Sequence, residues 1–116
     1  MTETPSPRIL VVDDDKAVRT ALKVNLGKSY QVTEVDCAEK ALKLLNTKAM
    51  DLILTDVAMP GMGGMALMRE VRANHPEVRV VVMTGYGSVA DAVDAMKAGA
   101  DDYLIKPIER AALLLI

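Results

Sequence analysis

Five short apolar runs alternate with segments of helical period along this chain, and no other feature restricts its fold as strongly. Strands that alternate with helices form βαβ units, in which helices cover both faces of a parallel sheet. We therefore predict an α/β domain built on a doubly wound sheet of five parallel strands. The predicted strands are residues 9–12, 30–35, 52–55, 78–83 and 103–105.

The segments between these runs carry apolar residues at the spacing of amphipathic helices. The first predicted helix is capped by Asp14 or Asp15 and ends at Gly27, and the third covers about residues 64–74. The fourth begins at a Ser88 cap, and a fifth follows Pro107. On the fourth helix we expect a buried stripe of Val89, Ala92, Val93 and Met96.

Length and composition limit the kind of protein. With 116 residues we expect one domain over residues 8–116, truncated in or after its fifth helix, and a disordered lead-in over residues 1–7. The 14 Lys and Arg residues nearly balance the 16 Asp and Glu residues, so we expect no direct contact with nucleic acid or with a membrane. The single cysteine, Cys37, excludes an internal disulfide and favours a reducing, cytoplasmic location.

Polar side chains stand where four of the predicted strands end. Asp13 and Asp14 follow the first strand, Asp56 the third, Thr84 the fourth and Lys106 the fifth. Right-handed crossovers place the carboxyl ends of parallel strands at one edge of the sheet, where such sheets bind their ligands. We therefore expect these five side chains to converge on one site.

Three carboxylates at one edge require a cation. Two carboxylates about 5 Å apart repel by roughly 3 kcal/mol at an effective dielectric constant near 20. Lys106 supplies one positive charge, and the remaining negative charge suits Mg²⁺, or Mn²⁺ in its place. The predicted cluster contains no His or Cys, which disfavours zinc. Such a site can perform phosphoryl transfer, with Asp56 as the attacking group and Thr84 and Lys106 bound to phosphoryl oxygens.

Four longer motifs surround these polar residues: ILVVDDD, LILTDVAMPGMGG, VVVMTGYGS and DDYLIKP. In this order and spacing they resemble the receiver domain of bacterial two-component response regulators, over about residues 8–110. The resemblance implies a flavodoxin-like sheet with strand order 2-1-3-4-5, and a signalling phosphoacceptor rather than an enzyme. The stretch TGYGSVADAVDAMKAGADDYLIKPI looks most like receivers of sigma-54 activators and related transcription regulators.

The resemblance also implies roles for individual residues. Asp56 accepts a phosphoryl group from a histidine of a sensor kinase, and it holds the metal together with Asp13, Asp14 and the backbone carbonyl of Ala58. Thr84 is the hydroxyl that moves toward the phosphoryl group, and Lys106 is the cation that pairs with it.

Further roles implied by the resemblance concern the switch and its lifetime. Tyr103 is the aromatic whose rotamer reports phosphorylation, and the Lys106–Pro107 peptide bond is cis. Ala58 and Tyr86 tune dephosphorylation, which we expect to be slow because neither positions a water molecule well. Phosphorylation is expected to switch the face of the fourth helix, fifth strand and fifth helix, which serves a partner or a homodimer.

Two other functions use similar sheets. A flavodoxin-like cofactor-binding module needs a Gly-, Ser- or Thr-rich phosphate loop after the first strand, where this chain has three aspartates. A phosphatase of the dehalogenase type also forms an aspartyl phosphate, but it wants a second aspartate two residues after the nucleophile. Ala58 occupies that position here.

Overall fold

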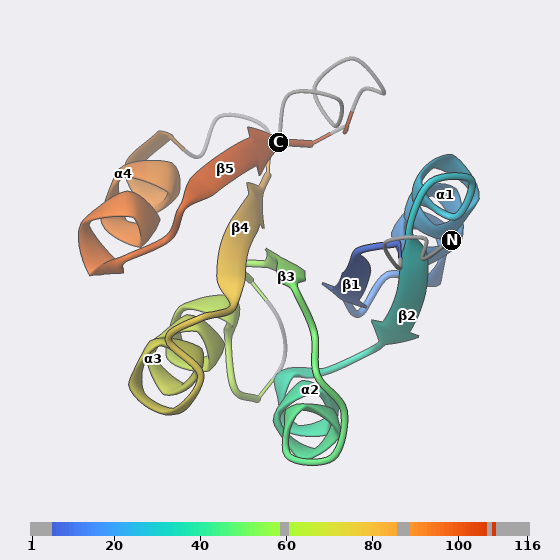
Figure 1. Ribbon diagram of the computed structural model, residues 1–116. Helices are drawn as coiled ribbons and strands as arrows, with labels where there is room; N and C mark the ends of the chain where they lie inside the picture. The colour runs from blue at the N-terminus through green and yellow to red at the C-terminus, as the bar shows by residue number, and fades with distance from the viewer. Residues whose placement is uncertain (1–5, 59–60, 86–88, 107, 109–116) are drawn as a thin grey trace.

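The computed structural model of the protein describes residues 6–58, 61–85, 89–106 and 108 (Figure 1). Several sequence predictions lie outside these residues and stay predictions. They are most of the lead-in, the Ser88 cap, the role of Tyr86, the Lys106–Pro107 peptide bond and the fifth helix.

A five-stranded parallel sheet forms the centre of the protein, in the order β2-β1-β3-β4-β5. This order and the parallel pairing confirm the predicted doubly wound α/β fold. The central strands β1, β3 and β4 are almost fully buried, whereas β2 and β5 are the half-exposed edges. The strands are β1 (Arg8–Val12), β2 (Gln31–Val35), β3 (Leu52–Asp56), β4 (Arg79–Thr84) and β5 (Asp102–Ile105).

Helices cover both faces of the sheet, as Figure 1 shows. Successive residues of a strand point to opposite faces, so Ile9 and Val11 pack against α1 while Leu10 and Val12 pack in the core beneath α2, α3 and α4. The Asp15 carboxylate accepts a hydrogen bond from the Ala17 N–H at 2.9 Å and is the cap of α1. The helices are α1 (Lys16–Leu26), α2 (Ala38–Leu45), α3 (Gly64–Asn74) and α4 (Val89–Ala98).

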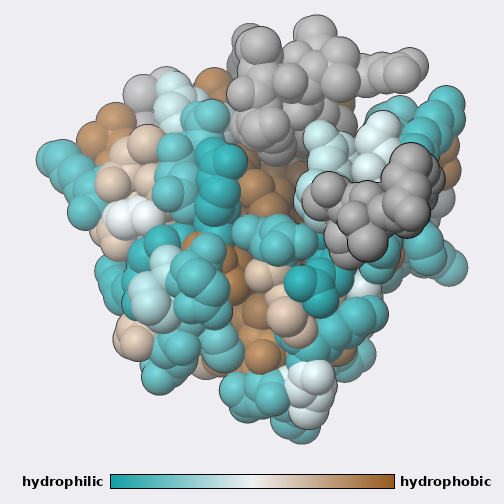
Figure 2. All heavy atoms as spheres, viewed as in Figure 1, coloured by the Kyte–Doolittle hydropathy of each residue, from teal (hydrophilic) through white to brown (hydrophobic). Residues whose placement is uncertain are grey.

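On the face seen in Figure 2, hydrophobic residues gather along the middle of the molecule, over the sheet, and hydrophilic residues surround them on the helices. The buried apolar residues form two clusters, one on each face of the sheet. Within the residues that the structure describes, no helix is long and apolar enough to cross a membrane.

The buried face of α4 differs from the predicted stripe. Ala92 and Ala95 are buried against the sheet, at 2% and 0% exposure, whereas Val93 and Met96 are 45% and 40% exposed. The prediction of Val93 and Met96 as core residues was therefore wrong. The helix lies close to the sheet through alanines, and its larger apolar side chains are turned away by the helical period of 3.6 residues.

Candidate functional site at the acidic edge of the sheet

Three aspartates meet at the carboxyl edge of the sheet, as the sequence predicts. Asp13 and Asp14 follow β1, and Asp56 is the last residue of β3. One carboxylate oxygen from each lies within 4.8 Å of the others. Asp13 is fully buried and Asp56 is 7% exposed, whereas Asp14 is exposed to solvent. The cluster is thus buried on one side and accessible on the other.

Lys106 joins this cluster from the end of β5. Its Nζ atom donates to Asp13 Oδ2 at 2.8 Å and to Asp56 Oδ2 at 3.1 Å. Its backbone N–H donates to the Thr84 carbonyl at 2.8 Å, which ties the residue to the neighbouring strand β4. One ammonium group therefore bridges two carboxylates that are 93 and 50 residues away in sequence.

The charges at this edge are not balanced by the lysine alone. Burial raises the pKa of the Asp56 carboxyl above its ordinary value, and the nearby Asp13 adds to this, while Lys106 and the Ala58 N–H oppose it. Burial lowers the pKa of Lys106, but its hydrogen bonds to Asp13 and Asp56 outweigh burial and raise it overall. The site therefore keeps Lys106 charged and holds an Asp56 carboxylate that a further cation would stabilise.

The raised pKa of Asp56 predicts that its ionised form destabilises the metal-free protein. A carboxyl whose pKa is higher in the folded state stabilises the fold below pH 3.8, its ordinary value, and loses this contribution as the pH rises through the folded pKa. We expect Asp56→Asn to raise the melting temperature at pH 7 by about 4 °C, corresponding to about 1 kcal/mol. Thermal unfolding across pH should show this gain disappear in acid.

The matched control for this stability measurement is Asp51→Asn. Asp51 flanks the opposite end of β3 and forms an exposed ion pair with Arg8 at 3.6 Å. Its replacement should give no gain, because an exposed pair contributes at most about 1 kcal/mol to stability. A lower melting temperature for Asp56→Asn than for the wild type at pH 7 would contradict the inference that the ionised Asp56 carboxylate destabilises the metal-free protein.

Thr84 completes the edge from β4. It is 1% exposed, and it follows Met83, which pairs in register with Asp56. Within the part of the chain that the structure describes, its Oγ atom is buried and has no hydrogen-bond partner. Buried hydroxyls without a partner are costly, so this one is available to a ligand oxygen.

Comparison with known proteins decides the family. Residues 9–116 match the family described as the response regulator receiver domain. The chain belongs to this family. The matched residues include all four motifs on which the resemblance to receiver domains rests.

This receiver domain is 45% identical over 108 residues to the response regulator protein FleR of Pseudomonas aeruginosa, covering 92% of this chain and 23% of FleR. It is 44% identical over 102 residues to the transcriptional regulatory protein ZraR of Escherichia coli (strain K12), covering 87% of this chain and 23% of ZraR. The crystal structure of the receiver domain of NtrX from Brucella abortus has a TM-score of 0.88 to it, at 34% identity over 92% of each chain. The chain therefore spans about a quarter of the length of these two relatives, and the ZraR description agrees with the predicted transcription-regulating group.

The acidic cluster of the receiver domain fits a hard divalent cation such as Mg²⁺. All three side chains offer carboxylate oxygens, and the cluster found among the described residues contains no His or Cys. The Ala58 N–H donates to Asp56 Oδ1 at 3.2 Å, which keeps residue 58 beside the carboxylate. The use of the Ala58 carbonyl as a metal ligand stays a prediction.

Tyr103 lies on the edge strand β5, which Lys106 directly follows, and it pairs in register with Val82 of β4. Its side chain is 39% exposed. The exposure fits an aromatic residue at a surface that can rearrange. Its role as a reporter of phosphorylation stays a prediction.

The receiver's loop after Asp56 approaches α3 so closely that only glycine fits at residue 64. A Cβ atom on Gly64 would overlap the Asp56 carbonyl oxygen and lie 2.9 Å from the Val57 Cα. The Gly64 N–H donates to the Val57 carbonyl at 2.9 Å, which fastens this approach. Gly64 is therefore needed for α3 to pack against the backbone of Asp56 and Val57.

We expect Gly64→Ala to destabilise the domain by about 3 kcal/mol, because the atoms that it meets belong to the backbone and cannot turn aside. Chemical denaturation measures this loss. Gly63→Ala is the matched control, since a Cβ there would lie 3.4 Å from the Val57 carbonyl oxygen in ordinary contact. Equal stability of the two variants would show that the loop moves freely and would contradict the close approach.

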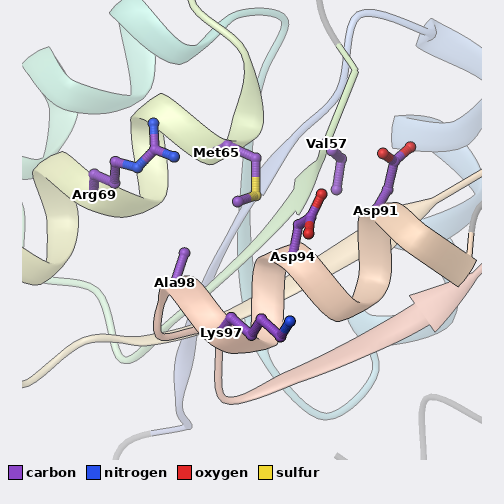
Figure 3. A pocket seen from close by; sticks show the side chains of 7 residues that line it. All are labelled: Val57, Met65, Arg69, Asp91, Asp94, Lys97 and Ala98. Atoms are coloured by element: carbon purple, nitrogen blue, oxygen red, sulfur yellow. The ribbon is translucent and has the colours of Figure 1, made fainter.

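A hollow of about 450 Å³ lies between α3 and α4 (Figure 3). The side chains of Asp91 and Asp94 rise from α4 toward Val57, which directly follows Asp56. Met65 and Arg69 of α3 and Lys97 and Ala98 of α4 complete its lining.

Two charged residues near the site were not singled out from the sequence. Arg19 of α1 donates from Nη1 to the Asp13 carbonyl and from Nε to Glu34 of β2. The signal was present: Arg19 stands three residues before Leu22 and seven before Leu26, on the buried face of an amphipathic helix. A charged residue on such a face needs partners, and these lie on the loop that carries Asp13 and on the strand β2.

Proposed function

We propose that this receiver domain accepts a phosphoryl group on Asp56 and thereby controls an output, which for this group of receivers is transcription. One observation carries the proposal: Asp13, Asp14 and Asp56 present oxygens within 4.8 Å of one another, and Lys106 binds two of them. The hydroxyl of Thr84 at the same edge, which has no hydrogen-bond partner among the described residues, supports it. The family membership of the chain supports it independently.

In the proposed transfer, an oxygen of the Asp56 carboxylate attacks the phosphorus of a phosphohistidine on a sensor kinase. A P–O bond forms, the P–N bond breaks, and the imidazole leaves with the electron pair and takes up a proton. Thr84 donates its hydroxyl proton to one phosphoryl oxygen, and Lys106 pairs with another. Mg²⁺, held by Asp13, Asp14, Asp56 and the Ala58 carbonyl, supplies charge neutralisation when it is bound.

The output face is proposed to comprise α4, β5 and the segment after it. Val93, Met96, Tyr103 and Ile105 form an apolar group on α4 and β5, each between 39% and 45% exposed. The alanine face of α4 and the hollow beside α3 support a helix that shifts at low cost between two positions. Sedimentation with beryllofluoride, a phosphoryl mimic, should show a homodimer, and a species that stays monomeric would count against dimerisation through this face.

Further parts of the proposal concern the cellular setting. The domain, covering residues 8–116, works in the cytoplasm as a phosphoacceptor that catalyses only its own phosphorylation and a slow dephosphorylation, tuned by Ala58 and Tyr86. A sensor histidine kinase is its phosphoryl donor, and it does not contact DNA itself. The near balance of charge and the single cysteine support these points.

Incubation with acetyl phosphate and Mg²⁺, followed by intact mass spectrometry, tests the proposed function. We expect a single phosphoryl adduct that survives gel filtration. Release of phosphate at many turnovers without an adduct would favour a phosphatase of the dehalogenase type. Tight flavin binding without an adduct would favour a cofactor-binding module.

A further inference from the structure

We propose that Arg19 is a positioning residue for the acidic site, acting through the backbone of Asp13 on the metal ligand Asp14. The inference rests on the proposed function, because it assigns Asp14 to metal binding. It concerns a side chain that touches neither the carboxylates of the cluster nor the phosphoryl group.

Arg19 connects three elements at the carboxyl edge of the sheet. Its Nη1 atom donates to the Asp13 carbonyl at 2.8 Å, and its Nε atom donates to Glu34 Oε1 at 3.1 Å. The side chains of Arg19 and Glu34 are only 13% and 28% exposed. A planar guanidinium group with two fixed partners holds both at a defined distance and angle. The loop after β1 is thus fastened to α1 and β2.

This contact matters most for Asp14. The Asp13 carboxylate is already fixed, because Oδ1 accepts from the Asp15 N–H at 2.9 Å and Oδ2 from Lys106 at 2.8 Å. Among the residues that the structure describes, the exposed Asp14 side chain has neither a hydrogen bond nor an ion pair. Its position therefore follows from the peptide that links it to Asp13, whose carbonyl Arg19 holds.

The charge of Arg19 does not compete for the site. Glu34 is its ion-pair partner, and its bond to the cluster goes to a carbonyl rather than to a carboxylate. Lys106, in contrast, binds two carboxylate oxygens directly. Arg19 therefore orients the metal-binding residues without pairing with their carboxylates, as residues that contact metal ligands commonly do.

Isothermal titration with Mg²⁺ alone tests this role. We expect Arg19→Ala to weaken Mg²⁺ binding about tenfold, in the range found when groups that orient metal ligands are removed. Arg19→Lys keeps the charge but cannot bridge both partners, so it should lie between Arg19→Ala and the wild type. Arg8→Ala is the matched control, since Arg8 pairs with Asp51 at the opposite edge of the sheet and should leave binding unchanged.

A double-mutant cycle separates positioning from general loss of structure. In an Asp14→Ala background, Arg19→Ala should weaken Mg²⁺ binding by less than about twofold, because the residue through which it acts is gone. An equal loss in both backgrounds, or no loss in the wild-type background, would overturn the inference. If thermal unfolding shows that Arg19→Ala does not fold, Arg19→Lys carries the same comparison.

The outcome for the wild type separates this inference from the function on which it rests. A wild-type protein that binds Mg²⁺ and accepts phosphate, with Arg19 variants that match it, would overturn the positioning role alone. A wild-type protein that binds no Mg²⁺ would overturn the proposed function and the positioning role together.

Discussion

Asp56→Asn should lower the amount of phosphoryl adduct formed from acetyl phosphate at least 100-fold. The amide replaces the only proposed nucleophile, and it also removes one of the three charges that hold the divalent cation. The adduct is measured by intact mass after equal incubation of variant and wild type. This is the largest effect that we expect from a single substitution.

Asp51→Asn is the control for the adduct measurement, because it makes the same chemical change at the residue just before β3, the strand that Asp56 ends. Its carboxylate accepts from the Arg8 backbone N–H at 2.7 Å and lies far from the acidic edge. We expect a normal adduct in this variant. A normal adduct in Asp56→Asn as well would show that another residue accepts the phosphoryl group.

Thr84→Val should change stability and function in opposite directions. Its hydroxyl oxygen is buried without a partner in the described structure, so replacing it by a methyl group of similar shape should stabilise the metal-free protein by about 1 kcal/mol. The same change removes a donor to the phosphoryl group, so beryllofluoride should bind about tenfold more weakly in the presence of Mg²⁺. Urea denaturation and calorimetric titration measure the two effects.

The neighbouring strand offers a matched threonine for this comparison. Thr55 of β3 is fully buried too, but its hydroxyl donates to the Asp56 carbonyl at 3.1 Å. Thr55→Val should therefore destabilise the protein by about 1 kcal/mol, because it removes a hydrogen bond that the folded protein makes. If Thr84→Val proved as destabilising as Thr55→Val, the Thr84 hydroxyl would have to be bonded in the free protein, and the account of this residue would fail.

The sheet and its acidic edge could be predicted from the sequence because both depend on regular patterns. Apolar runs separated by helical stripes define a parallel sheet, and a parallel sheet brings the residues after its strands to one edge. Asp13, Asp56 and Lys106 meet there although up to 93 residues separate them. The cap of α1 was limited to two neighbouring aspartates, and the structure selects Asp15.

Features that depend on packing distances could not be predicted in this way. The hydrophobicity of Val93 and Met96 suggested a core position, but α4 packs on the sheet through Ala92 and Ala95 instead. Gly64 was predicted only as the start of the third helix, and its close approach to the Asp56 carbonyl is a contact that no sequence pattern reveals.

The contribution of Arg19 was hidden for a related reason. Its position on the buried face of α1 indicated that it has a partner, but both partners lie on other elements, Glu34 on β2 and the Asp13 carbonyl after β1. Sequence alone does not give the rotation of α1 about its axis, which decides where the guanidinium group points.

Chemical trapping of the acyl phosphate identifies the residue that accepts the phosphoryl group. Borohydride reduction of the acetyl-phosphate-treated protein converts an aspartyl phosphate to homoserine, which peptide mass spectrometry locates. We predict homoserine at Asp56 alone. Homoserine at Asp13 or Asp14, with Asp56 unmodified, would contradict the assignment of Asp56 as the phosphoacceptor.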